Sequence, residues 1–337
     1  SHLRLVATDF EVGMDIAGKV LKMRRDGHAL IKLMGGRAVH PNWGLPGGVS
    51  RGINEEQRAE IEKLGRDAIE FAKFSLKLFE DVVLKNSDYL KLITGEIYVH
   101  KTYNMGMVDA ANCTNFYDGK IRVTGPDGKE FAKYDAKDYQ QHIAERVEPW
   151  SYLKFPYLKK VGWKGLVDGP DSGVYKATPL SRCNVAEAMA TPLANAQYKR
   201  MYETLGGKPV HHTLATHWAR LVELLYAAER WVELATDPEI TSKEYRVLPT
   251  KTPTEGVGCV EAPRGTLTHH YATDERGILA KVNLIVGTTN NNAPISMSVK
   301  KAAQGLIKKG EVREGLLNMV EMAFRAYDPC FGCATHS

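Results

Sequence analysis

Apolar residues recur every three to four positions along several stretches of this chain, which is the spacing of one face of an α-helix. The longest stretch covers residues 54–86, where charged residues separate the apolar ones. Another covers residues 14–34 and runs into Gly35 and Gly36, a signal for a helix C-cap. Further helices are predicted over residues 136–147, 192–205, 212–236, 296–308 and 311–327. This pattern predicts a helical bundle.

Two parts of the chain have the pattern of β-strands instead. Residues 119–134 are typical of a hairpin, because Gly125-Pro126-Asp127-Gly128 supplies a turn between two apolar runs. Residues 256–294 contain three short β-like runs, at Val257–Val260, Leu279–Val282 and Leu284–Val286. There is no internal repeat and no low-complexity linker. We therefore expect one domain over residues 1–337, mainly α with small β excursions.

Composition narrows the class of protein. The chain has 337 residues, of which 43% are hydrophobic and 25% charged, and these values are ordinary for a globular protein. The net charge of +5 is mild for this length. No long Lys/Arg block is interleaved with aromatic residues, which argues against nucleic-acid binding. No apolar run approaches the roughly 18–20 residues that span a bilayer. The five cysteines are an odd number, which favours a reducing compartment, and we expect the cytoplasm.

Candidate metal ligands gather near the C-terminus, in the run Asp328-Pro329-Cys330-Phe331-Gly332-Cys333-Ala334-Thr335-His336. Thiolates select thiophilic metals such as zinc, nickel and iron, and histidine is a common further ligand. Because proline disfavours helical geometry at the residue before it, these side chains are expected where a helix ends. An isolated CxxC pair is also typical of half a zinc site, a redox pair or two unrelated buried cysteines.

A second candidate is Arg264, which stands between Pro263 and Gly265. A guanidinium in a tight Pro-Arg-Gly turn stays cationic and does not compete as a metal ligand, so it suits a position over a charged site. The alternative is a salt bridge to Glu261 or to another carboxylate. These residues alone do not decide between the two interpretations.

The motifs together resemble the large subunit of nickel–iron hydrogenases. The resemblance rests on Glu261-Ala262-Pro263-Arg264-Gly265 with His269, on Val286-Gly287-Thr288-Thr289-Asn290-Asn291, on Asp328-Pro329-Cys330-x-x-Cys333-x-x-His336 and on the loop at residues 36–48. It runs from Ser1 to Ser337. The details are most similar to the cytoplasmic branch of methanogens, in the variety that does not reduce deazaflavin and is associated with heterodisulfide reductase.

The resemblance implies a nickel and an iron ion bridged by two cysteine thiolates, with carbon monoxide and two cyanides on the iron. Cys330 would be a terminal nickel ligand and the thiolate that accepts a proton when dihydrogen is cleaved. Cys333 would bridge nickel and iron. The guanidinium of Arg264 would lie over the open bridging position, and Asp328 would help to hold it.

The resemblance also implies a set of surrounding residues and partners. Pro263 and Thr288 would lie against the cyanides, with Thr288 donating a hydrogen bond. His336 and the backbone carbonyl of Leu284 would bind a nearby magnesium or another divalent ion. An iron–sulfur small subunit would receive the electrons, and a further electron-transfer subunit would pass them to a heterodisulfide reductase complex.

Three departures from the family pattern qualify these expectations. The N-terminal CxxC that supplies two more thiolates is absent, so we expect the sequence to begin beyond that motif, with the N-terminal segment missing. Gly287 stands where many members have proline, and the chain stops one residue after His336, as a processed end would.

The alternatives are a deazaflavin-reducing or NAD-linked hydrogenase, a zinc-binding or redox CxxC protein, and a non-catalytic relative of the quinone-side subunit of complex I. The relatives of complex I have lost the cysteines, so Cys330 and Cys333 argue against the last of these.

Overall fold

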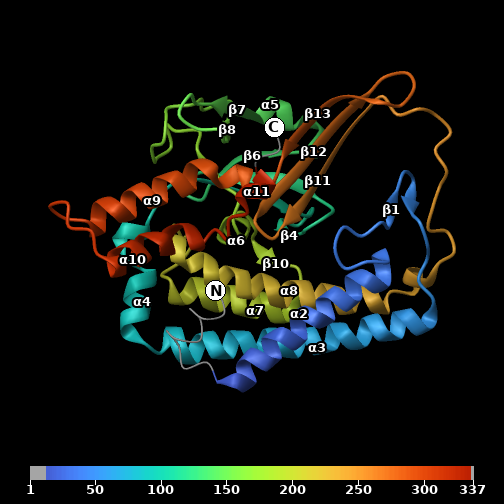
Figure 1. The fold of residues 1–337 in the computed structure, drawn as a ribbon, viewed down its shortest axis with the longest axis horizontal. Helices are drawn as coiled ribbons and strands as arrows, with labels where there is room; N and C mark the ends of the chain where they lie inside the picture. The colour runs from blue at the N-terminus through green and yellow to red at the C-terminus, as the bar shows by residue number, and fades with distance from the viewer. Residues whose placement is uncertain (1–12, 335–337) are drawn as a thin grey trace. The chain divides into compact units, whose positions relative to one another are not determined.

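The computed structural model describes residues 13–334, which fall into two compact units (Figure 1). The first unit contains the chain up to residue 86 together with residues 224–251. The second contains residues 87–223 and the chain from residue 252 onward. Helix α8 (Thr216–Thr236) contributes residues to both. The expectation of a single domain over residues 1–337 stays a prediction.

The first unit is built on two long helices that lie side by side, α2 (Met14–Gly35) and α3 (Glu55–Phe79) (Figure 1). A capping box starts α3, because the Asn54 side chain accepts the backbone N–H of Gln57 and the Gln57 side chain accepts that of Asn54. Gly36 ends α2 in the left-handed conformation, with φ of 81°. The helix predicted over residues 14–34 is therefore confirmed, together with its C-cap.

The remainder of the first unit is short. Helix α3 continues into a π-helical turn, η1 (Glu80–Leu84), so the helix predicted over residues 54–86 is confirmed in extent but not in its last turn. The loop between α2 and α3 forms a small ribbon of β1 (Gly44–Leu45) and β2 (Gly48–Val49). A 3-10 turn, η5 (Pro238–Thr241), follows α8. The core of this unit is apolar and includes Ile53, Ile61 and Ala235, with Leu30, Leu33 and Trp43 packed against them.

A mixed sheet organises the second unit. Its strands follow the order β10-β4-β3-β5-β6, and β9 pairs in parallel with β3. The strands are β3 (Tyr103–Val108), β4 (Cys113–Thr114), β5 (Lys120–Thr124), β6 (Glu130–Tyr134), β9 (Tyr175–Lys176) and β10 (Ala188–Met189). Every residue of β3 is buried, so β3 lies at the centre of the core. The hairpin predicted over residues 119–134 is confirmed as β5 and β6.

The helix predicted over residues 136–147 is wrong. The chain makes a 3-10 turn, η3 (Ala136–Asp138), then one helical turn, α5 (Tyr139–His142), and then strand β7 (Ile143–Val147). Strand β7 pairs antiparallel with β8 (Lys154–Leu158). The paired residues are 7 to 15 positions apart, from Val147 with Lys154 to Ile143 with Leu158. This hairpin pairing overrides the weak helical pattern of the segment.

A three-stranded antiparallel sheet forms a second β structure in this unit, with β11 (Glu255–Ala262), β12 (Gly265–Thr273) and β13 (Leu279–Ile285). Figure 1 shows it as a long ribbon, with α11 beside the end where β11 turns into β12. The run predicted at Val257–Val260 lies in β11, and the runs at Leu279–Val282 and Leu284–Val286 belong to one strand, β13. No predicted run covered β12. Helices still dominate the described residues, but the β structure exceeds the small excursions that the sequence predicted.

The second unit also contains a set of helices and 3-10 turns. They are α4 (Ser87–Ile93), η2 (Glu96–Tyr98), α6 (Pro179–Val185), α7 (Pro192–Thr204), η4 (Thr213–Ala215), η6 (Thr289–Asn291), α9 (Asn292–Leu306), α10 (Glu314–Arg325) and α11 (Phe331–Ala334). Helices α7, α8, α9 and α10 confirm the four further helix predictions to within a few residues. Over residues 13–334, each helix is too short or too polar to cross a membrane.

Candidate metal centre at the C-terminal cysteines

The two candidate cysteines lie on one short turn after α10. Asp328 has a left-handed backbone with φ of 50°, and it is followed by Pro329 and then by α11. The carbonyl of Cys330 accepts the N–H groups of Cys333 and Ala334, both at 3.1 Å. This single turn brings the Cα atoms of Cys330 and Cys333 to 5.3 Å, and their sulfur atoms are joined as a disulfide. Reduced, the same turn presents two thiolates at one point of the fold.

Arg264 reaches this turn from the β11–β12 hairpin. Ala262 pairs with Gly265, so Pro263 and Arg264 form a two-residue turn between the strands. The Arg264 side chain donates from Nε to the backbone carbonyl of Asp328, and its Nη2 lies 3.2 Å from the Asp328 carboxylate. About half of the Asp328 side chain remains exposed. The backbone carbonyl and the carboxylate of Asp328 therefore both hold the guanidinium, and Asp328 lies two positions before Cys330.

Gly265 is required by this turn for two reasons. Its φ of 153° is one that side-chain-bearing residues rarely adopt. A Cβ at this position would also collide with the carbonyl oxygen of Gly287 and lie 2.9 Å from that of Ala177. Gly287 in turn would bring a Cβ to 3.2 Å from the backbone of Gly265. This close approach of two backbones fixes the hairpin turn against the segment that follows β13.

The segment at residues 286–291 connects the hairpin turn to the cysteine turn. Thr288 is buried, and its Oγ1 accepts the backbone N–H of Cys330 at 3.1 Å. Since that bond uses only an oxygen lone pair, the hydroxyl proton of Thr288 is available for another acceptor. The Asn291 side chain donates to the carbonyl of Arg264 at 2.8 Å and accepts the N–H of Ala177 at 2.9 Å.

The other predicted site residues are placed as follows. Pro263 forms the hairpin turn with Arg264, and its carbonyl accepts a hydrogen bond from Arg182 at 3.1 Å. Leu284 lies in β13, opposite His269 of β12. His336 lies outside the described residues, so its role as an ion ligand stays a prediction. Glu261 does not pair with Arg264, whose partner is Asp328.

Sequence reasoning missed the buried charges beside the hairpin. Arg182 is 1% exposed and forms ion pairs with Glu223 at 2.6 Å and with Glu261 at 3.2 Å. These partners are 41 and 79 positions away from it, and no spacing rule in the sequence connects them. Burial acts to lower the pKa of Arg182, but the Glu223 and Glu261 carboxylates together outweigh burial, so the net shift is upward and the guanidinium stays charged.

The donor set has the chemistry of a soft-metal site but is incomplete. Two thiolates suit nickel or iron, and a nearby guanidinium adds positive charge without competing as a ligand. Within residues 13–334, no group of three or more His, Cys, Asp or Glu side chains is arranged to hold a metal ion. Cys330 and Cys333 would therefore be two ligands of a larger set.

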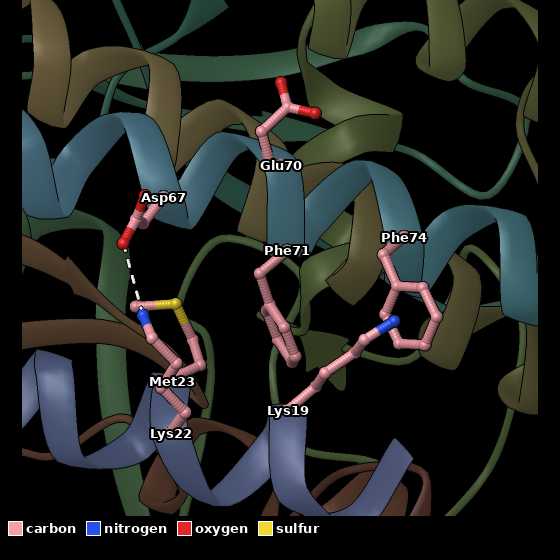
Figure 2. Close-up of a pocket in the computed structure, with 7 residues that line it drawn as sticks. All are labelled: Lys19, Lys22, Met23, Asp67, Glu70, Phe71 and Phe74. Carbon is pink, nitrogen blue, oxygen red and sulfur yellow. Dashed lines mark hydrogen bonds and ion pairs between the residues drawn. The ribbon is translucent and has the colours of Figure 1, made fainter. Parts of the chain in front are cut away.

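A cavity of the first unit has a different character. It measures about 390 Å³ and lies between α2 and α3, as Figure 2 shows. Its lining consists of Lys19, Lys22, Met23, Asp67, Glu70, Phe71 and Phe74, and none of these residues carries a thiol. Lys22 pairs with Asp67 at 3.2 Å, and Lys19 lies 4.3 Å from the ring centroid of Phe74. Both lysines are thus bound to neighbours within the same unit.

Residues 95–336 match the sequence profile of the nickel-dependent hydrogenase family. This chain belongs to that family. It is 48% identical to an F420-non-reducing hydrogenase iron-sulfur subunit of Archaeoglobus profundus, over 99% of this chain and 68% of the relative. It is 39% identical to an F420-non-reducing hydrogenase subunit of Methanothermobacter thermautotrophicus, over 96% of this chain and 66% of the relative. The chain thus spans about two thirds of the length of these curated relatives.

A solved structure supports the same assignment. The fold matches an NAD+-reducing [NiFe]-hydrogenase in the H2-reduced state with a TM-score of 0.88 and 32% identity, covering 99% of this chain and 71% of that one. The sequence-based identification of a nickel–iron hydrogenase large-subunit relative is confirmed. Membership of a nickel-dependent family is consistent with the pair Cys330 and Cys333, because nickel is a thiophilic metal.

Proposed function

We propose that this chain is the catalytic subunit of a nickel–iron hydrogenase and that it takes part in the reversible, heterolytic cleavage of dihydrogen. The observation that carries the proposal is the junction of the Arg264–Asp328 ion pair with the turn that holds Cys330 and Cys333. Dihydrogen has no polar group to bind, so its cleavage needs a Lewis-acidic metal and a base close together. The nickel–iron centre, when bound, supplies the Lewis acid.

The residues of this chain then have distinct tasks. With the centre bound, the thiolates of Cys330 and Cys333 would both hold metal, and that of Cys330 would also accept the proton. Arg264 keeps a fixed positive charge over the reacting position, and Asp328 limits its movement by accepting from two of its nitrogens. The remaining metal ligands come from outside the described residues.

We further propose that carbon monoxide and two cyanides complete the iron, with Pro263 and Thr288 against the cyanides. The hydroxyl proton of Thr288, which its bond with Cys330 leaves available, supports the role of a donor. A magnesium or another divalent ion would bind His336 and the carbonyl of Leu284.

The electron route is proposed from the names of the relatives. Both curated relatives are called F420-non-reducing, which supports a route that does not reduce deazaflavin. We propose that an iron–sulfur small subunit receives the electrons and that a further subunit passes them to a heterodisulfide reductase complex in the cytoplasm. The NAD-linked alternative is supported by the likeness to the NAD+-reducing enzyme.

The test is metal content and an infrared spectrum of the full-length protein purified with its natural partners. Nickel and iron together with bands of metal-bound carbon monoxide and cyanide support the proposal, and zinc alone would overturn it. Cys330→Ser is expected to abolish nickel binding and dihydrogen-dependent dye reduction. Cys113→Ser is the matched control, since Cys113 is a free thiol on β4. Supplying deazaflavin, NAD or heterodisulfide as acceptor separates the electron routes.

A further inference from the structure

Arg182 uses all five of its N–H donors in the interior of the second unit. Its Nε and Nη2 form a fork with the two carboxylate oxygens of Glu223, at 2.7 and 2.6 Å. Its Nη1 donates to Glu261 at 3.2 Å. The two donors that remain go to backbone carbonyls, those of Ala262 at 3.0 Å and Pro263 at 3.1 Å. A guanidinium is the only side chain that presents five donors in one plane.

The two carbonyls belong to the residues directly before Arg264. The Glu261 carboxylate, which is shared with Arg182, also accepts the backbone N–H of Met107 at 2.7 Å and the hydroxyl of Thr266 at 2.9 Å. Arg182 and Glu261 therefore fasten both sides of the β11–β12 turn to strand β3 and helix α6. The turn is also held on its inner side, because Gly265 packs directly on the backbone of Gly287.

Stability alone is a poor reason for such a cluster. Moving three charges out of water is costly, and apolar residues of similar volume often stabilise a core equally well. What apolar residues cannot do is hold two carbonyl oxygens at fixed positions. The direction of the donors, more than the charge itself, is therefore the property that the hairpin turn depends on.

We propose that Arg182 is a positioning residue for the dihydrogen reaction. By fixing the carbonyls of Ala262 and Pro263, it sets how far the guanidinium of Arg264 reaches toward Asp328 and Cys330. Glu223 acts through Arg182, since it holds the guanidinium in the orientation that serves both carbonyls. This inference rests on the proposed function only for its effect on turnover, and its effect on the hairpin is independent of any metal.

The first test is Arg182→Lys in the full-length enzyme with its partners. Lysine keeps the charge but has three donors, so it cannot serve two carboxylates and two carbonyls together. The expected result is a loss of turnover of roughly 10- to 100-fold, the size that follows a small misplacement of a catalytic group. Nickel content and the KM for dihydrogen are expected to stay unchanged.

Arg122→Lys is the matched control. Arg122 is also nearly buried, pairs with Glu130 and Glu187, and donates to the carbonyl of Val185, but these contacts are not on the hairpin turn. It is expected to leave turnover unchanged. If Arg182→Lys does not fold, Glu223→Gln replaces it, because glutamine keeps the volume and removes one acceptor from the fork. Equal turnover losses in the two arginine variants would overturn the proposal.

A double-mutant cycle separates positioning from a general structural effect. If Arg182 acts through Arg264, then Arg182→Lys causes little further loss in an Arg264→Lys background. If the turnover loss of the double variant equals the product of the losses of the two single variants, the residues act independently and the proposal is overturned. Hydrogen exchange of residues 255–273 gives a second readout, and faster exchange in Arg182→Lys than in Arg122→Lys is expected. If the wild-type protein itself shows no hydrogenase activity and Arg182→Lys still exchanges faster than Arg122→Lys, the proposed function is refuted and the structural role of Arg182 stands.

Discussion

The guanidinium of Arg264 lies 3.2 Å from the carboxylate of Asp328, although 64 positions separate the two residues. The contact joins the β11–β12 turn to the residue that precedes Pro329 and Cys330. It is partly exposed, so the pair itself adds little to stability. Its role is to fix geometry, because it holds a permanent cation close to the turn that carries Cys330 and Cys333.

Replacing Asp328 with asparagine tests that geometry. Asparagine tolerates the left-handed backbone at this position, so the turn is retained while the charge is lost. The backbone carbonyl that accepts from Arg264 Nε also remains. We expect the free energy of unfolding to change by less than about 1 kcal/mol, and turnover of dihydrogen to fall by roughly tenfold or more. Denaturant titration and dihydrogen-dependent dye reduction measure the two effects, and an unchanged turnover would contradict the role given to Asp328.

The hydrogen bond between Thr288 and the backbone of Cys330 can be tested by replacing Thr288 with valine. Valine has nearly the same shape but carries a methyl group in place of the hydroxyl. Thr288→Val removes the acceptor for the Cys330 N–H, which costs about 1–3 kcal/mol when that group is buried. Thr288→Ser keeps the acceptor and is expected to retain most of the stability. Urea midpoints of the two variants check this difference, and equal midpoints would show that the hydrogen bond has no net value. A shift of the cyanide infrared bands in the valine variant alone would support the donor role.

Much of the fold was predictable from local patterns, whereas the arrangement around the site was only partly so. Helices α2 and α3 follow an apolar period with clear start and stop signals, and β5 and β6 flank a Gly-Pro-Asp-Gly turn. Strand β7 was missed because its partner β8 determines its conformation. A four-residue helix followed directly by a strand leaves no periodic pattern long enough to detect.

The same distinction applies to the candidate site. Cys330, Cys333 and Arg264 stand in motifs, so they could be proposed from the sequence. Arg182 could not, because a single arginine outside any motif has no sequence signal until the fold brings Glu223 and Glu261 to it. Glu261 was considered as a partner of Arg264, and the structure gives it to Arg182 instead. Charge alone does not show whether Arg264 pairs with the carboxylate of Glu261 or with that of Asp328.

Gly265 is predicted to be the least replaceable residue of the hairpin turn. Gly265→Ala combines an unfavourable φ with a collision against the carbonyl of Gly287, and we expect it to lower the free energy of unfolding by about 1–3 kcal/mol or more. Gly258→Ala is the matched control in strand β11, because a Cβ there meets nothing within 4 Å. Thermal unfolding of both variants distinguishes them. If they unfold at the same temperature, the close approach of Gly265 and Gly287 is not needed for folding.

Lys176 is predicted to make the free energy of unfolding change with pH in the alkaline range. It is fully buried in β9, and burial lowers its pKa from 10.5 to about 8, while Asp168 opposes this shift and Lys301 adds to it. Between about pH 8 and 10.5 the unfolded chain holds a proton that the folded chain has released, so Lys176 makes stability rise with pH, by at most about 1.4 kcal/mol per unit. Lys176→Met lacks this contribution, whereas Lys208, whose pKa burial also lowers to about 8, contributes equally to both proteins. The free energy of unfolding of the wild type relative to the variant should therefore increase from pH 8 to pH 10, and parallel curves would show that Lys176 does not titrate in this range.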